Sequence, residues 1–280
     1  MNRDDDFHFR ILQDIAQDLS GEVNFPTCLD AAIVVRNTLR EPNVLLDKVA
    51  QVISVEPLIA SKLLRLANSV PYNPSGQTIS DLKTAIGRLG LEAVRTTSLA
   101  VAMDQMLKSR HVEAFEALSK VTWEHSLEAA AICRVLARRI GRVNPDEALL
   151  AGMVHDIGIF YLLYRAADYP EYLEEPEAIR ELVAGWHESI GESLLHALGL
   201  PDRIVEAVRD HDQPRCGTDD PCTLRDVVYF ANLLAGDVFE RLPGPAPAQS
   251  EAEAQDRARY ADLLEEAEDD IRELRSALAG

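Results

Sequence analysis

The apolar residues of this chain repeat with the period of an α-helix, and this pattern constrains the fold more than any other feature. Leu, Ile, Val and Ala recur at positions i, i+3, i+4 and i+7, which places them on one face of a helix. Clear examples are "LDAAIVVRNTL", "PLIASKLLRLANS" and "DLKTAIGRLGLEAVRTTSLAVAMDQML". No segment alternates apolar and polar residues as strands do, and no G-x-G-x-x-G motif is present. The sequence therefore predicts an all-α fold and argues against a nucleotide-binding α/β fold.

Interruptions of the helical pattern divide the chain. Residues 1–19 are expected to form an N-terminal extension, followed by an N-terminal helical half (20–112) and a second helical half (113–241). Residues 242–280 hold the Pro/Ala linker "LPGPAPAQS" and a charged C-terminal helix. That helix carries a thin apolar stripe made of Tyr260, Leu263, Leu264, Ile271, Leu274 and Leu278. We interpret it as a helix laid on the body of the protein, with a dimerisation or partner-binding helix, and hence a homodimer, as the alternative.

The charge balance narrows the classes of partner. Lys and Arg number 28 against 47 Asp and Glu, a net charge of −19, which repels phosphate backbones and anionic lipid. We therefore expect no nucleic acid and no membrane partner, and favour basic protein partners. No run approaches the ~20 apolar residues that span a bilayer, and the start, "MNRDDDFHFR", lacks the apolar core of a secretory signal. These features predict a cytoplasmic protein.

The four cysteines, Cys28, Cys133, Cys216 and Cys222, form no C-x-x-C pair. Without export they are expected to be free thiols in a reducing compartment. Cys216 and Cys222 share a Pro/Gly/Asp-rich loop, where a zinc pair is the less favoured interpretation.

Polar residues on apolar helix faces are the main functional signal. His125, His155, His187 and His211 each lie on the apolar stripe of their own segment, and Asp156 follows His155 in "LLAGMVHDIGIFYLLYR", which is read as a helix apolar all round. Any one of them could be satisfied by a separate hydrogen bond. A buried carboxylate and four buried imidazoles together favour a shared partner, one or two metal ions. Iron, zinc and manganese suit these ligands.

These residues also carry a family resemblance. "HDIG" at 155–158, with His125 30 residues before it, resembles the HD superfamily of metal-dependent phosphohydrolases. His187 and His211 fall where the cyclic-di-nucleotide phosphodiesterases of that superfamily place further metal histidines. The segments "LLRLANSVPYN" and "ISDLKTAIGRLGLEAVRTTSLA", with "WEHSLEAAAICRVLAR" and "HESIGESLLHALGLPDRIVEAVRDHDQP", narrow the resemblance to the HDOD family, the HD-related output domain, over residues 20–240.

The resemblance implies an N-terminal helical subdomain and a C-terminal HD-like helical bundle. It also implies a bacterial signal-transduction module that works through binding, and many such proteins lack an intact metal set. Two departures bear on catalysis. Asn232 stands where the superfamily has its last Asp ligand, as an additional ligand position, with Asp237 as a less favoured substitute. Ile159 stands where active cyclic-di-nucleotide phosphodiesterases carry a Lys, and nearby Arg165, Arg203 and Arg209 are expected at the surface.

The leading prediction is a regulatory module that binds protein partners in a signalling pathway, with a degenerate metal site and no catalytic residue assigned. The alternative is a metal-dependent phosphohydrolase or phosphodiesterase acting on a nucleotide or cyclic dinucleotide, with His187 or His211 orienting the phosphate. A third reading is a pocket that binds a nucleotide second messenger without cleaving it.

Overall fold

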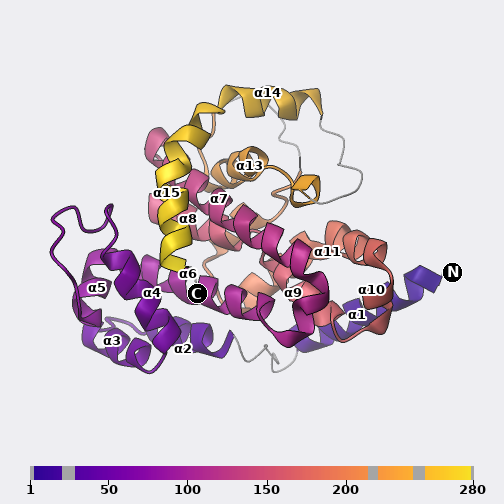
Figure 1. Cartoon of the computed structure of the whole chain (residues 1–280), viewed down its shortest axis with the longest axis horizontal. Coiled ribbons are helices and arrows are strands. Elements are labelled where there is room, and N and C mark those ends of the chain that lie inside the picture. Colours follow the sequence, from indigo (N-terminus) through magenta and orange to yellow (C-terminus); the bar gives the residue numbers. More distant parts are fainter. Residues whose placement is uncertain (1–2, 21–28, 214–219, 242–249, 279–280) are drawn as a thin grey trace.

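The protein is built from helices. The computed structural model describes residues 3–20, 29–213, 220–241 and 250–278, and every regular element in these ranges is an α-helix or a 3-10 helix (Figure 1). The predicted all-α fold is confirmed. The first half contains α1 (Arg3–Ser20), α2 (Asp30–Leu39), α3 (Leu46–Ser54), α4 (Pro57–Ala67), α5 (Leu82–Leu89), α6 (Leu91–Leu107) and the 3-10 helix η2 (Arg110–Phe115).

The second half follows in sequence. It contains α7 (Glu116–Ile140), α8 (Pro145–Val154), α9 (Ile157–Ala166), α10 (Pro170–Glu174), α11 (Pro176–Ala197), α12 (Asp202–Val208), α13 (Leu224–Ala235), the 3-10 helix η3 (Val238–Arg241), α14 (Glu251–Arg259) and α15 (Asp262–Leu278).

Two hydrophobic clusters form the core. The smaller cluster joins α2 to α6 through buried side chains such as Val35, Ile53, Leu63 and Ile86. The larger cluster centres on α7, whose 25 residues span about 37 Å. The residues predicted as an N-terminal extension include α1, which lies beside α9 and α11 and buries Ile11 and Ile15 in the larger cluster.

The helix α7 is central because α8, α13 and α15 all pack against it. Small residues permit the close approach of α8: a Cβ atom added at Gly152 would lie 2.8 Å from the Cα of Ala130. The helix ends where Gly141 adopts a left-handed conformation (φ 69°), which a residue with a side chain adopts at a cost.

The apolar segment around the His–Asp pair differs from the prediction. It is not one helix: α8 ends at Val154, His155 and Asp156 form a turn, and α9 begins at Ile157. The expectation that no run is long and apolar enough to cross a membrane is wrong by composition, because residues Pro145–Ala166 are. In the structure 89% of their most apolar window is buried inside the protein, as in a core element. The turn places the pair at a corner between two helices, from which both side chains reach the interior.

The C-terminal residues also differ from the single helix expected. A break at Tyr260 separates α14 from α15, which are drawn in yellow in Figure 1. The apolar side of α15, including Leu263, Leu274 and Leu278, is buried against α7 and α4 of the same chain. The interpretation of a helix laid on the body is therefore confirmed for α15, while the homodimer stays a prediction. Linker residues 242–249 lie outside the described residues.

Candidate metal centre

Four separate parts of the fold bring the predicted residues together. His125 comes from the middle of α7, His155 and Asp156 from the turn between α8 and α9, His187 from α11, and His211 from three residues beyond the end of α12. All five are buried, none being more than 6% exposed. His125 and His187 project from helices, and the other three residues lie in turns at helix ends. Because all five are buried in the packed core, that core positions each side chain.

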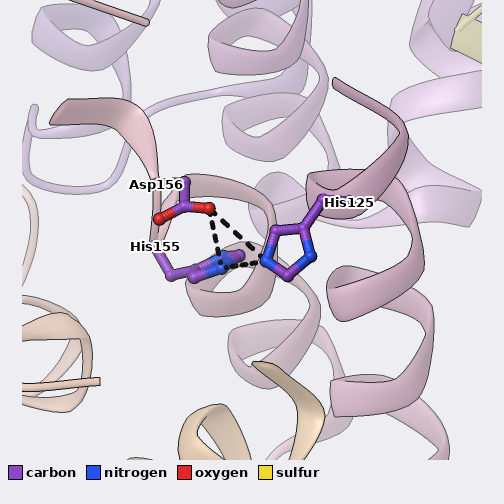
Figure 2. Close-up of side chains that lie close together, drawn as sticks. All are labelled: His125, His155 and Asp156. Atoms are coloured by element: carbon purple, nitrogen blue, oxygen red, sulfur yellow. Dashed lines mark hydrogen bonds and ion pairs between the residues drawn. The ribbon is translucent and has the colours of Figure 1, made fainter. Parts of the chain in front are cut away.

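One oxygen of Asp156 faces two imidazoles. Its Oδ2 lies 3.4 Å from Nε2 of His125 and 3.3 Å from Nε2 of His155, and the two nitrogens are 3.0 Å apart (Figure 2). We call these three residues the first triangle.

The other oxygen of Asp156 faces the remaining pair. Its Oδ1 lies 3.1 Å from Nε2 of His211 and 3.8 Å from Nε2 of His187, and these nitrogens are 3.4 Å apart. We call Asp156, His187 and His211 the second triangle. The carboxylate therefore stands between two sets of imidazole nitrogens, each set facing one of its oxygens.

Backbone contacts set which nitrogen of three rings is available. Nδ1 of His155 lies 2.7 Å from the carbonyl oxygen of Gly152, and Nδ1 of His187 and of His211 each lie 2.8 Å from a carbonyl in the preceding turn. A carbonyl only accepts, so Nδ1 carries the proton and donates it. In the neutral ring the lone pair then resides on Nε2, the atom aimed at Asp156, and this is how metal-binding histidines are oriented.

This donor set fits a metal ion. Atoms bound about 2.1 Å from one ion lie about 3.0 to 3.4 Å from one another, from octahedral to tetrahedral geometry. The three edges of the first triangle, 3.0, 3.3 and 3.4 Å, fall in that range. Nδ1 of His125 is buried without a hydrogen-bond partner among the described residues. Lone pairs crowded around one point are what a cation at that point would resolve.

The electrostatics of the cluster also favour an ionised carboxylate among imidazoles. Burial opposes ionisation of Asp156, but His155 and a hydrogen bond from His211 hold the pKa of its carboxyl well below the usual value. Burial lowers the pKa of His125 to about 4, which keeps that ring neutral. Burial opposes protonation of His211 as well, yet Asp212 and Asp156 together raise its pKa to about 9, so that Nε2 of this ring is protonated and donates to Oδ1 of Asp156. A metal bound at Nε2 would replace that proton.

One carboxylate of the cluster, Asp212, was not predicted from the sequence. Asp212 follows His211 directly, and its Oδ2 lies 3.2 Å from Nε2 of His187 at the edge of the second triangle. Glu188 supports it, since its carboxylate accepts a hydrogen bond of 3.1 Å from the backbone N–H of Asp212. The signal was present in "RDHDQ" at 209–213, where a second acidic residue flanks the histidine just after α12.

Asn232 has a different contact from the one expected of a ligand. Its side-chain amide nitrogen donates a 2.7 Å hydrogen bond to Oδ1 of Asp212. It therefore holds the missed carboxylate in place, and its role as a ligand stays a prediction. Asp237, the weaker substitute, accepts a hydrogen bond from the backbone N–H of Phe239.

The cationic side chains considered from the sequence are paired elsewhere. Arg165 forms an ion pair with Asp18, and Arg203 forms one with Glu147. Arg209 lies 3.2 Å from Glu192. Ile159 is 2% exposed and belongs to the larger hydrophobic cluster.

The alternative zinc pair cannot be described, because Cys216, like Cys28, lies outside the described residues. Of the other two cysteines, Cys133 is a buried free thiol and Cys222 an exposed one.

Known proteins share this fold. A crystal structure of a candidate metal-dependent phosphohydrolase from Shewanella amazonensis SB2B superimposes with a TM-score of 0.73 at 22% identity, covering 97% of this chain and 99% of that one. An HDOD domain protein of unknown function from Geobacter sulfurreducens gives a TM-score of 0.59 at 22% identity, covering 95% and 96%. At these identities the likeness establishes the fold alone.

Comparison of the sequence with known proteins finds a distant relative and a matching family. An uncharacterized protein from Treponema pallidum (strain Nichols) is 23% identical over 242 residues, which are 79% of this chain and 45% of that protein. The chain thus spans less than half the length of this relative. The HDOD domain matches residues 25–214, more than half of the chain, and the protein therefore belongs to the HDOD domain family.

Proposed function

We propose that this chain is a bacterial regulatory module that holds a divalent metal in an HD-type site and acts by binding protein partners rather than by hydrolysis. The observation that carries the proposal is the convergence of four buried imidazole nitrogens on the two oxygens of Asp156. A carboxylate that faces two separate ligand sets suits one ion or a bridged pair.

The residues that would hold the metal are those of the two triangles, with Asp212 as a further donor to the second. A bound divalent ion would supply Lewis-acid character and would lower the pKa of bound water. The chain itself fixes the ring orientations through the Nδ1–H donations of His155, His187 and His211. Neutral imidazoles and carboxylates suit iron, zinc or manganese.

The distribution of cations supports a role without phosphate cleavage. Cleaving a phosphodiester requires positive groups that stabilise charge as it develops on the phosphoryl oxygens. Arg165, Arg203 and Arg209 are each paired with a carboxylate, and Ile159, three residues after Asp156, is a buried apolar residue that offers no charge. With a net charge of −19, the surface favours basic protein partners in a signalling pathway.

Metal content is the first test. The full chain is purified under aerobic and anaerobic conditions, and its iron, zinc and manganese are measured by elemental analysis beside Asp156→Asn and the control Asp269→Asn, which removes an exposed carboxylate. We expect near-stoichiometric metal in the wild type and the control, and little in Asp156→Asn. A wild type without metal in both preparations would rule out the metal site.

The second candidate is a metal-dependent phosphohydrolase or phosphodiesterase acting on a nucleotide or cyclic dinucleotide. It is favoured by Asp212, which adds a carboxylate at the second triangle. Turnover of bis(4-nitrophenyl) phosphate with added manganese separates the two proposals. Turnover that Asp156→Asn abolishes and Asp269→Asn preserves would replace the regulatory proposal with this one.

A further inference from the structure

A cavity of about 310 Å³ lies between the two helical halves, away from the metal cluster. Its walls come from α2, from α6 and from the segment 198–202 that joins α11 to α12. The volume is at the lower end of the range, about 300 to 1,000 Å³, that small-molecule sites occupy. From His187 to Leu198 there are eleven residues of α11 and its end, or about 16 Å, so the cavity is separate from the cluster.

Three arginines line this cavity. Arg36 and Arg40 come from one face of α2 and its C-terminal cap, and Arg95 comes from α6. Arg36 donates to the carbonyl oxygen of Ala197 (3.0 Å) and to the amide oxygen of Asn37. Arg40 donates to the carbonyl oxygen of Gly199 (3.1 Å). Each guanidinium has five N–H groups, so both retain donors beyond these contacts.

The charge of these arginines is poorly compensated. Within the described residues, no carboxylate forms an ion pair with Arg36 or Arg40, and Arg95 has only Glu92, at 3.6 Å. Nε of Arg95 is buried without a hydrogen-bond partner in the same part of the chain. Burial and the charge of Arg40 together lower the pKa of Arg36. One carboxylate, Asp202, lines the cavity with them.

Capping of α11 explains part of this arrangement. The helix ends at Ala197, and cations are stabilised beside the carbonyl groups at a helix C-terminus. That end carries only about half a negative charge. Capping of α11 does not account for the position of Arg95. It also does not explain why a cavity lies beside three clustered cations in a chain whose net charge is −19.

We propose that this cavity is a binding site for a small phosphate ester. Guanidinium groups bind phosphate oxygens in pairs of hydrogen bonds, which suits Arg better than Lys. The remaining walls are partly apolar, with Leu99, Leu198 and Leu200 among them, and would contact the organic part of the ligand. A local cluster of three cations outweighs the net negative charge because fields at a lined cavity are set by nearby groups.

The test uses phenyl phosphate as the probe, with inorganic phosphate and phenol as comparisons. Binding to the full chain is measured by isothermal titration calorimetry at constant ionic strength, for protein as purified and for protein stripped of metal with a chelator that is then removed. We expect a Kd of about 1 mM or lower for phenyl phosphate and a higher Kd for inorganic phosphate. Phenol should not bind.

The variants are Arg36→Gln and Arg40→Gln, with Arg272→Gln as the control because Arg272 is an exposed arginine of α15. Each cavity variant should weaken binding roughly tenfold or more, since each removes charge-assisted hydrogen bonds. Arg272→Gln should bind like the wild type. Arg40→Lys, which keeps the charge and loses the planar fork, should bind with intermediate affinity. Thermal unfolding of each variant establishes that it is folded.

Three results would overturn the proposal. One is the absence of phenyl phosphate binding by folded wild-type protein at about 10 mM. Another is an equal loss of affinity in Arg272→Gln, which would indicate a general charge effect. The third is binding that needs the metal and is unchanged in both cavity variants, which would place the anion at the metal cluster instead.

Discussion

The closest contact between α9 and α11 yields a sharp prediction for Gly158→Ala. A Cβ atom added at Gly158 would lie 2.0 Å from the carbonyl oxygen of His187 and 2.8 Å from the backbone nitrogen of Gly191. Both atoms are backbone, so no side-chain rotation relieves the overlap. The two helices would have to separate by about 1.4 Å before the methyl group reached an ordinary contact distance of 3.4 Å.

The free energy of this change can be estimated from two opposing effects. Overpacking in a well-packed interior costs about 1–3 kcal/mol and occasionally more. Replacing a helical glycine with alanine stabilises the helix by up to about 1 kcal/mol, because alanine has the higher helix propensity. Since the overlap at Gly158 involves only rigid atoms, we expect a net loss of about 2–3 kcal/mol in the free energy of unfolding. For a chain of this size that lowers Tm by about 4–12 °C.

Two glycines of α11 provide matched controls for the thermal unfolding assay. Gly185→Ala adds a methyl group where nothing lies within 4 Å, and should raise stability by about 0.5–1 kcal/mol. Gly191→Ala meets backbone atoms of Gly158 at 3.4 and 3.7 Å, and should fall between the other two. A Tm for Gly158→Ala equal to or above that of the wild type would refute the reasoning. Metal content should also fall in this variant, because α11 carries His187.

Three further predictions concern α7, Cys222 and α15. Arg134→Met should lower the free energy of unfolding by about 3 kcal/mol in a urea titration, because Asp270, 2.9 Å from Arg134, then keeps only Arg138 as an ion-pair partner among the described residues. Adding Asp270→Leu should recover most of the loss. An alkylating reagent should modify Cys222 in the native protein but reach Cys133 only on unfolding, as peptide mapping would show, because burial raises the pKa of the Cys133 thiol. Removing residues 243–280 should lower Tm without changing the oligomeric mass in light scattering, because α15 is buried within its own chain.

The sequence predicted the elements whose signal is local. Helical period alone is enough for α4 or α7, because the apolar face and the end signals are contained in the segment itself. The helical period did not predict the turn at His155 and Asp156. The apolar run continues through that turn, and periodicity does not show that the chain changes direction there. It failed again at Tyr260, where two polar helices meet without proline or glycine to mark the break.

The candidate site was predictable to the extent that a polar residue on an apolar face is conspicuous. His125 and His187 stand out in this way, because apolar residues such as Ile132 and Leu194 share their faces. Asp212 does not stand out in the sequence, because it lies in a polar stretch, and its side chain is about half exposed in the structure. The arginine-lined cavity could not be predicted from the sequence, because Arg36, Arg95 and Gly199 are brought together only by the packing of distant segments.

The contact between Asn232 and Asp212 changes the interpretation of Asn232, which stands where the superfamily has an Asp ligand. A carboxylate at position 232 would lie about as close to Asp212 as the amide now does, 2.7 Å, and two ionised carboxylates at that distance repel each other. The amide instead donates to Asp212 and holds it next to His187. The neutral residue at 232 and the acidic residue at 212 therefore form one unit, in which the negative charge lies on the residue after His211 and not on α13. A carboxylate still stands beside the second triangle, so the neutral side chain of Asn232 argues less strongly against metal binding than it does alone. The case against hydrolysis rests on the paired arginines and on Ile159.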